Sequence, residues 1–197
     1  MSLAVGIALG AVCTYVGGRA LSNTREGESC SWVDDSRRVA IVLVGASERL
    51  VERQVDRRTG SLGFSHVIVD AAEHNARGQR LVYDVLPLLG VHRVPLSHRY
   101  GSRRNLLPRP LVRISLPVEV GTELRGAMRS QVGLPYDLPA TVDPKRPGLV
   151  CSRLVHRGLP MSLRSRIKPH SKRHPVSPNC IARAFGVEGP FSPDVEL

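Results

Sequence analysis

The chain has few cysteines and few aromatic residues. Its four cysteines, in 197 residues, are Cys13, Cys30, Cys151 and Cys180. They form no CxxC pair, which argues against a structural zinc site, and they are too scattered for a disulfide scaffold. The sequence leaves open a single disulfide bond, such as one between Cys30 and Cys180. Aromatic residues make up 4% of the chain, so the sequence indicates neither a stacking platform for single-stranded nucleic acid nor an aromatic-lined cleft.

The histidines lack the spacing of a metal site. We expect no metal and no cofactor, because no pair of them matches a ligand motif. Most are predicted to face solvent: His74, His92, His98, His156, His170 and His174.

Acidic residues are absent from two basic segments, 97–110 and 153–174. The whole chain has a formal net charge of +11 and a pI near 10.5, which favours an anionic partner. Nucleic acid, anionic lipid headgroups and acidic cell-wall polymers all fit, and a solvated basic face is the simpler interpretation.

Charged residues are also scarce at the N-terminus, where Arg19 is the single charged residue of the segment 3–21. As a helix this segment would be about 28 Å long, close to the ~30 Å core of a bilayer. Gly6 and Gly10 would allow close helix packing. We expect either a membrane anchor or uncleaved signal, or a helix that is buried or packed on a partner. A membrane-associated, cell-envelope or secreted location is favoured over a plain cytoplasmic one.

The sequence after residue 21 predicts an α+β domain at 37–187, preceded by a polar linker at 22–36 and followed by a tail at 188–197. An antiparallel sheet packed on helices is expected, since a run of strands is followed by helices. The predicted strands are 37–46, 65–72, 79–87, 90–96 and 111–120. The predicted helices are 47–60, 121–133, 149–160 and 177–187, with a proline-rich loop at 134–148.

A candidate nucleophile and base stand out from these elements. His66 lies at the front of the apolar run GFSHVIVDAAE, where a strand would favour Val or Ile. Cys151 follows a Pro-Gly break and begins an apolar-periodic helix, whose positive end favours the thiolate. A cysteine and a histidine in contact form a nucleophile and base pair. A half-exposed strand histidine and a core cysteine are the simpler interpretations.

Such a pair needs a third group to orient the imidazole, and two aspartates are near His66 in the sequence. Asp70 lies on the same strand, roughly 13 Å away at ~3.3 Å per residue. Asp84 lies across a hairpin whose turn centres near residues 75 and 76, which makes it a direct or diagonal neighbour of His66. We therefore expect Asp84 to be the orienting group.

Several short stretches resemble the circularly permuted NlpC/P60 group of papain-like proteins, especially the YiiX/YebB-type hydrolases. They are FSHVIV (64–69), RLVYDV (80–85), GLPYD (133–137), CSRLV (151–155) and SPNCIA (177–182). The resemblance covers about residues 37–187 and implies a papain-like fold. It implies that Cys151 is the nucleophile, His66 the base and Asp84 the orienting group. It also implies that Tyr136 and Ser152 contact the oxyanion or substrate.

The expected function is that of a cysteine-dependent hydrolase, which cleaves amide bonds by acyl transfer through a thioester. The resemblance to NlpC/P60 proteins implies cell-wall peptide as substrate. The permuted relatives imply the alternative, a lipid amide or ester hydrolase or an acyltransferase. A non-catalytic structural or anion-binding protein that keeps the fold is the alternative from another class.

Overall fold

The computed structural model of the protein describes residues 38–46, 62–100, 111–141, 145–146, 148–170 and 175–197. They belong to a compact unit that runs from Val33 to Leu197. Several expected features lie outside the described residues: the N-terminal helix 3–21, the linker 22–36, the helix 47–60 and most of the basic segment 97–110.

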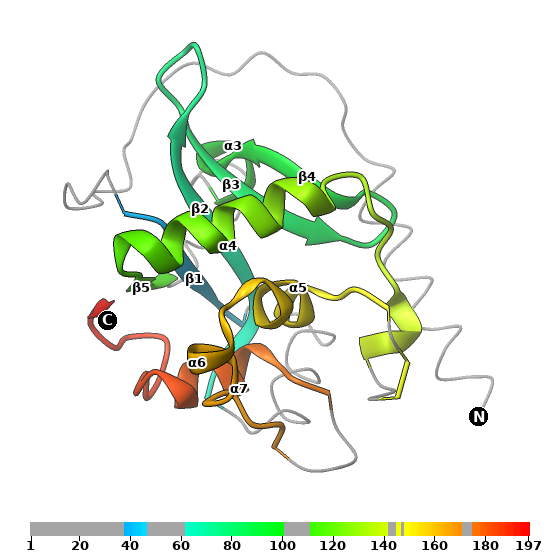
Figure 1. Cartoon of the computed structure of the whole chain (residues 1–197), viewed down its shortest axis with the longest axis vertical. Helices are drawn as coiled ribbons and strands as arrows, with labels where there is room; N and C mark the ends of the chain where they lie inside the picture. Colours follow the sequence, from blue (N-terminus) through cyan, green and yellow to red (C-terminus); the bar gives the residue numbers. More distant parts are fainter. Residues whose placement is uncertain (1–37, 47–61, 101–110, 142–144, 147, 171–174) are drawn as a thin grey trace. The chain divides into compact units, whose positions relative to one another are not determined.

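A six-stranded sheet organises this unit (Figure 1). The strand order is β4-β3-β2-β1-β5-β6, and all neighbours are antiparallel except β5 and β6, which are parallel. The expected antiparallel sheet is therefore corrected to a mixed one, because part of the expected tail returns to the sheet edge as β6. The strands are β1 Ala40–Gly45, β2 Phe64–His74, β3 Arg80–Leu86, β4 Gly90–Pro95, β5 Leu111–Ser115 and β6 Val195–Glu196.

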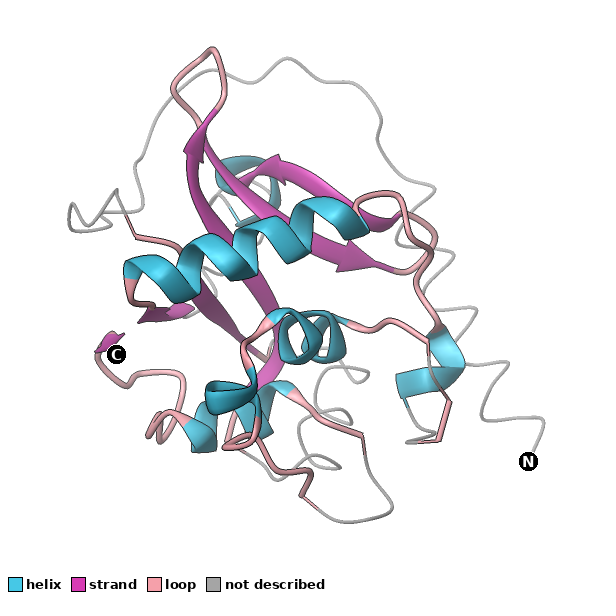
Figure 2. Cartoon of the chain, in the orientation of Figure 1, coloured by secondary structure: helices cyan, strands magenta, loops and turns pink. Residues whose placement is uncertain are grey.

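Short helices accompany the sheet, which makes the fold α+β (Figure 2). The helix α5 contacts β2, β3, α4 and α7, and α7 also contacts β2. The helices are α3 Leu96–Tyr100, α4 Val118–Gln131, η1 Leu138–Thr141, α5 Cys151–Gly158, α6 Met161–Arg164 and α7 Pro178–Ala184.

Two adjacent predicted boundaries are wrong. The strand expected at 111–120 ends at Ser115, and the helix expected from residue 121 begins at Val118. Pro117 explains both shifts, because it has no N–H to continue a strand ladder and is well tolerated where a helix begins. The strand thus ends early, and β5 lies between β1 and β6.

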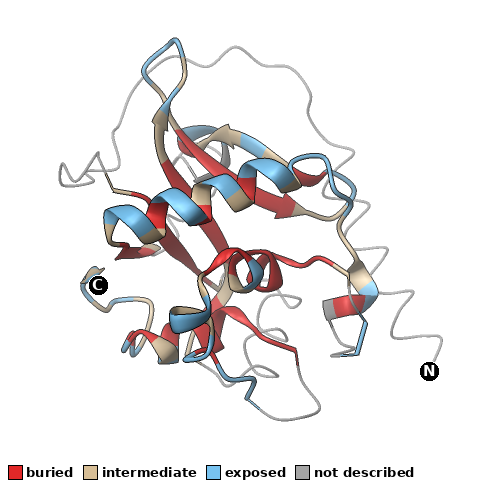
Figure 3. Cartoon of the chain, in the orientation of Figure 1, coloured by how far each residue is buried: buried red, intermediate tan, exposed pale blue. Residues whose placement is uncertain are grey.

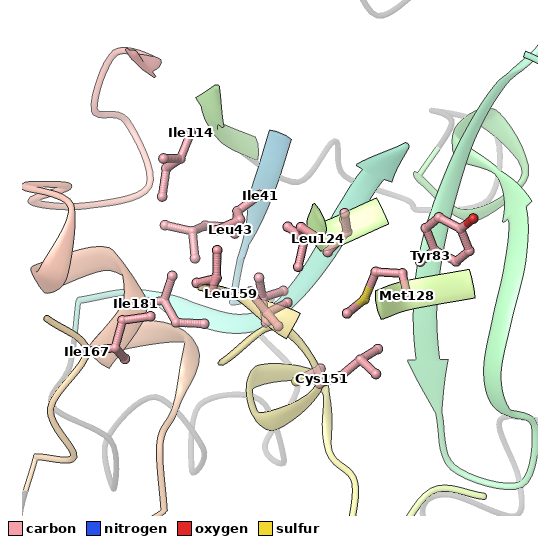
Figure 4. Packing of buried hydrophobic residues seen from close by; sticks show 14 of the residues in the cluster. Ile41, Leu43, Tyr83, Ile114, Leu124, Met128, Cys151, Leu159, Ile167 and Ile181 are labelled. Carbon is pink, nitrogen blue, oxygen red and sulfur yellow. The ribbon is translucent and has the colours of Figure 1, made fainter. Parts of the chain in front are cut away.

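The core lies between the sheet and the helices α4, α5 and α7 (Figures 3 and 4). Every residue of β1 is buried, as its continuous β-branched run predicts. The helices approach closely at Gly158, where a Cβ would lie 2.6 Å from Met128 Cε and 2.7 Å from Leu124 Cδ1. A larger residue at 158 would therefore require the Met128 and Leu124 side chains to shift.

Within the described part of the chain, no helix has both the length and the apolar character needed to cross a bilayer.

Candidate active site

His66 and Asp84 meet across two neighbouring strands. The pairing of β2 with β3 sets Val69 opposite Tyr83, and extending it makes Asp84 a diagonal neighbour of His66. His66 Nε2 lies 2.6 Å from Asp84 Oδ1. The Asp84 side chain is completely buried and its Oδ1 also accepts a hydrogen bond from the Val85 N–H at 2.7 Å. Two contacts therefore fix the carboxylate through this one oxygen.

The protonated form of His66 is favoured by its surroundings. Burial alone would lower the pKa of the imidazole. The negative charges of Asp84 and Cys151, and hydrogen bonds to both, outweigh that effect and raise the pKa of His66 to about 10. Because Nε2 faces Asp84, the other ring nitrogen, Nδ1, is left to face the thiol of Cys151. The histidine thus lies between a carboxylate and a sulfur.

Cys151 is the first residue of α5, after Val150 as the N-cap. It is a free thiol, buried at the border of the core cluster (Figure 4). The first N–H groups of a helix have no carbonyl partner within that helix, so they point toward whatever lies before its first turn. In α5 those groups belong to Cys151 and the residues that follow it.

Tyr136 completes the group. It lies on the segment between α4 and η1, which pairs with the chain just before Cys151 through a bridge from Tyr136 to Leu149. Burial first, and then the negative charges of Cys151, Asp84 and Asp137, raise the pKa of the Tyr136 phenol. The hydroxyl therefore stays protonated near the sulfur and can act as a hydrogen-bond donor.

Ser152 takes a different place from the one that the resemblance implies for its side chain. The hydroxyl is buried and donates to the Val176 carbonyl oxygen at 2.7 Å. It ties the first turn of α5 to the segment before α7. The side chain thus positions the helix, and the backbone N–H is the part that faces the helix N-terminus.

Arg153, counted above as part of a basic surface, is buried instead. Its guanidinium donates to the carbonyl oxygens of Arg146 and Gly148. The prediction of an anion-binding segment at 153–174 is corrected at this position, since Arg153 holds the loop before Cys151. Arg157, Arg166 and Lys168 in the same segment are exposed.

Asp70, the rejected partner, is occupied elsewhere. It accepts a hydrogen bond from Arg80 Nε at 2.7 Å and forms an ion pair with Arg113 Nη1 at 3.2 Å. The Ala72 N–H donates to its other oxygen at 3.0 Å. These contacts lie on the part of β2 that leads away from His66.

Sequence reasoning missed the role of Asn179. Its side chain is fully buried, and Oδ1 accepts a hydrogen bond at 3.2 Å from the N–H of Phe64, the first residue of β2. Asn179 thereby fixes the strand two residues before His66. Ser177 caps α7 by accepting a hydrogen bond from the Cys180 N–H. Ser before Pro is a typical start of a helix, but the SPN sequence carries no signal of the long-range contact made by Asn179.

A groove borders this group of residues. It has a volume of about 660 Å³ and shares Tyr136 with the group, although Cys151 and His66 do not line it. Asp137 and Arg146 form an ion pair there, with Nε 2.8 Å from Oδ2. The rest of the lining is mainly apolar: Leu134, Pro135, Leu138, Pro139, Gly148, Leu149 and Arg157. An acyl or apolar side chain would fit such a lining.

The other candidates from the sequence lie apart from this group. His74, His98 and His170 are exposed, while His92 and His156 are half-buried. In the described ranges no three His, Cys, Asp or Glu side chains are close enough to hold a metal ion. Cys180 is a buried free thiol. Cys13, Cys30 and His174 lie outside the described residues.

Comparison with known proteins gives this arrangement no relative: no family model, no curated protein and no solved structure matches the chain.

Proposed function

We propose that the chain is a cysteine-dependent hydrolase that cleaves amide bonds through a thioester on Cys151. The contact of 2.6 Å between Asp84 and His66, beside the thiol of Cys151, carries this proposal. A nucleophile next to a base that a third group orients is the arrangement that acyl transfer requires. The resemblance of the SHV, YDV and CSRLV stretches to permuted NlpC/P60 proteins supports the same assignment.

The protonation state of His66 defines the starting form of the site. With its pKa raised to about 10, the imidazole is protonated at neutral pH. A cation next to a thiol stabilises the thiolate. The reaction therefore begins from a thiolate and an imidazolium, and Asp84 balances the positive charge of the ring from the far side.

The bond changes follow from these charges. The Cys151 thiolate attacks the carbonyl carbon, and the S–C bond forms as the electron pair of the C=O bond moves to oxygen. Collapse of this intermediate breaks the C–N bond, and His66 gives its proton to the departing amine. Neutral His66 then takes a proton from water, whose oxygen attacks the thioester and releases the acid and the Cys151 thiolate.

Donors from two parts of the chain support the negative oxygen of the intermediate. The first is the N-terminal turn of α5, with the N–H groups of Cys151 and Ser152. The second is the Tyr136 hydroxyl, kept protonated by its buried position. In characterised enzymes, the loss of one such donor slows the reaction by about 10²–10³-fold.

Cell-wall peptide is the substrate class that we propose. The apolar lining of the groove beside Tyr136 favours a second candidate, the acyl chain of a lipid amide or ester. Purified peptidoglycan fragments and phospholipid vesicles, incubated separately with the protein, distinguish the two through the products that appear. Products of either substrate should disappear with Cys151→Ser; their persistence would contradict the assigned nucleophile.

The proposal is tested directly by thiol alkylation against pH. We expect iodoacetamide to modify Cys151 well below about pH 8, where an ordinary free thiol is largely protonated and slow. His66→Gln should remove this low-pH reaction, whereas His156→Gln on the same helix as Cys151 serves as the matched control and should not. Buried Cys180 provides an internal reference in each digest. A rate profile equal to that of an ordinary thiol would overturn the proposed function.

A further inference from the structure

Four exposed aliphatic side chains gather on two adjacent loops next to the groove. They are Leu88, Leu89, Val132 and Leu134, and we call them the apolar tip. Seven large apolar side chains are exposed in the described part of the chain, and these four are the ones that lie together. The remaining three are on separate elements: Val118 begins α4, Met161 begins α6 and Phe191 precedes β6.

The two loops are held as one surface by backbone contacts. The Val91 N–H donates to the Leu134 carbonyl at 2.8 Å, and the Gly133 N–H donates to the Val91 carbonyl at 2.8 Å. At Gly90 a Cβ would lie 2.2 Å from the same Leu134 carbonyl oxygen, so only glycine allows this approach. Figure 1 shows the end of α4 beside the β3–β4 turn, and Figure 3 shows exposed chain there.

Leu88 is an unfavourable choice for the fold. The Leu89 N–H donates to the Leu86 carbonyl at 3.2 Å, so residues 86–89 form a turn with Pro87 and Leu88 at its centre. Leu88 has φ of 69°, a conformation that turns usually give to Gly or Asn. Its side chain is also 71% exposed. The strained backbone reduces stability and the exposed leucine gains none from burial, which indicates that the side chain serves something outside the fold.

The charge around the tip indicates the kind of partner. The chain as a whole has a net charge of +11, and the lining of the groove beside the tip contains two arginines and one acid, Asp137. Arg146 and Arg157 line the groove that also contains Leu134. An apolar projection beside an excess of cations is complementary to a bilayer with anionic headgroups.

We propose that the apolar tip inserts into the headgroup region of an anionic lipid bilayer and brings the groove beside Tyr136 to the membrane surface. β3 carries both Asp84 and the start of the turn, and the segment after α4 carries both Leu134 and Tyr136. Docking through the tip therefore orients the candidate site toward the bilayer. The proposal does not depend on the chemistry of Cys151, because the tip is defined by exposure and charge.

The test is co-sedimentation of the full chain with vesicles of phosphatidylcholine and phosphatidylglycerol, and with vesicles of phosphatidylcholine alone. A Cys151→Ser background excludes turnover of the lipid. We expect binding to the anionic vesicles to weaken in high salt. We expect Leu88→Asn with Leu89→Ser to reduce the partition constant about tenfold or more, since two leucines leave the apolar region. The segment 3–21 is the same in the parent and in every variant, so its contribution to binding cancels in the ratio of their partition constants.

The matched control is Val118→Ser with Met161→Ser, which removes as many exposed apolar side chains away from the tip. Its partition constant should equal that of the parent. The tip variant, Leu88→Asn with Leu89→Ser, should keep or raise the melting temperature, because Asn tolerates positive φ and Leu89 is exposed, and this excludes misfolding as the cause of lost binding. Equal binding by parent and tip variant, or an equal loss in the control, overturns the proposal. A parent dimer that the tip variant converts to a monomer, without vesicle binding, would assign the surface to a second copy of the chain.

Discussion

Asp70 and Asp84 are two buried carboxylates on neighbouring strands, each 1% exposed, with opposite kinds of partner. Asp70 is held by Arg80, Arg113 and the Ala72 N–H. Asp84 is held by His66 and the Val85 N–H. Arginine keeps its charge at any pH that the protein meets, whereas histidine can lose its proton. The first cluster can only hold structure, and the second can also move a proton.

The largest difference between the two clusters should appear in stability. We expect Asp70→Asn to reduce the free energy of unfolding by about 3–5 kcal/mol, because it leaves two largely buried guanidinium groups without their counter-charge. Denaturant unfolding measures the change. Glu188→Gln, the same chemical change at an exposed position, should stay within about 0.5 kcal/mol of the parent. A loss no larger than that of this control would mean that the arginines do not depend on Asp70.

The second difference should appear in reactivity. We expect Asp84→Asn to slow alkylation of Cys151 at pH 6 about tenfold, since an amide stabilises the imidazolium less than a carboxylate does and the thiolate loses its cation. Folded Asp70→Asn should react like the parent, which makes it the control for a general effect of a lost carboxylate. Equal slowing by both substitutions would erase the distinction between the clusters.

The smallest expected effect is on the pH dependence of stability, and its sign is fixed by the pKa of His66. The pKa of His66 is raised from 6.5 to about 10 in the folded chain, so the folded state binds the proton more tightly than the unfolded state. The stability from this site is therefore fully present below pH 6.5 and is lost as pH rises through about 10. We expect the stability difference between the parent and His66→Gln to shrink over this window. A difference that grows with pH would show that the imidazole is neutral in the folded protein.

The strands and their pairing could be read from the sequence because their signals are local. The apolar runs around Val42 and Val67 and the turn at Asn75 are enough to predict three strands and a hairpin. That predicted hairpin placed Asp84 near His66, and in the structure His66 Nε2 lies 2.6 Å from Asp84 Oδ1. Whether Cys151 attacks a substrate, and whether the fold is papain-like, remain proposals.

The remaining features depend on contacts that no local pattern encodes. Val195 and Glu196 become a strand only because β5 offers them an open edge. Arg153 has the composition of a surface residue, yet the carbonyl groups of a loop five to seven residues earlier bury it. The Ser152 hydroxyl likewise bonds a carbonyl far along the chain. Tertiary partners decide such positions, and the partners of Arg153 and Ser152 are backbone atoms without a sequence signature.

The bond from Phe64 to Asn179 joins residues 115 positions apart, and it constrains the order in which the molecule can be built. During synthesis the segment with the histidine leaves the ribosome long before the asparagine that fixes its entry into the sheet. Such distant closures are slow to form. A chain that ends before α7 would therefore keep the thiol and the imidazole but lack the residue that sets the start of β2. We expect the candidate site to form only after the last residues have left the ribosome.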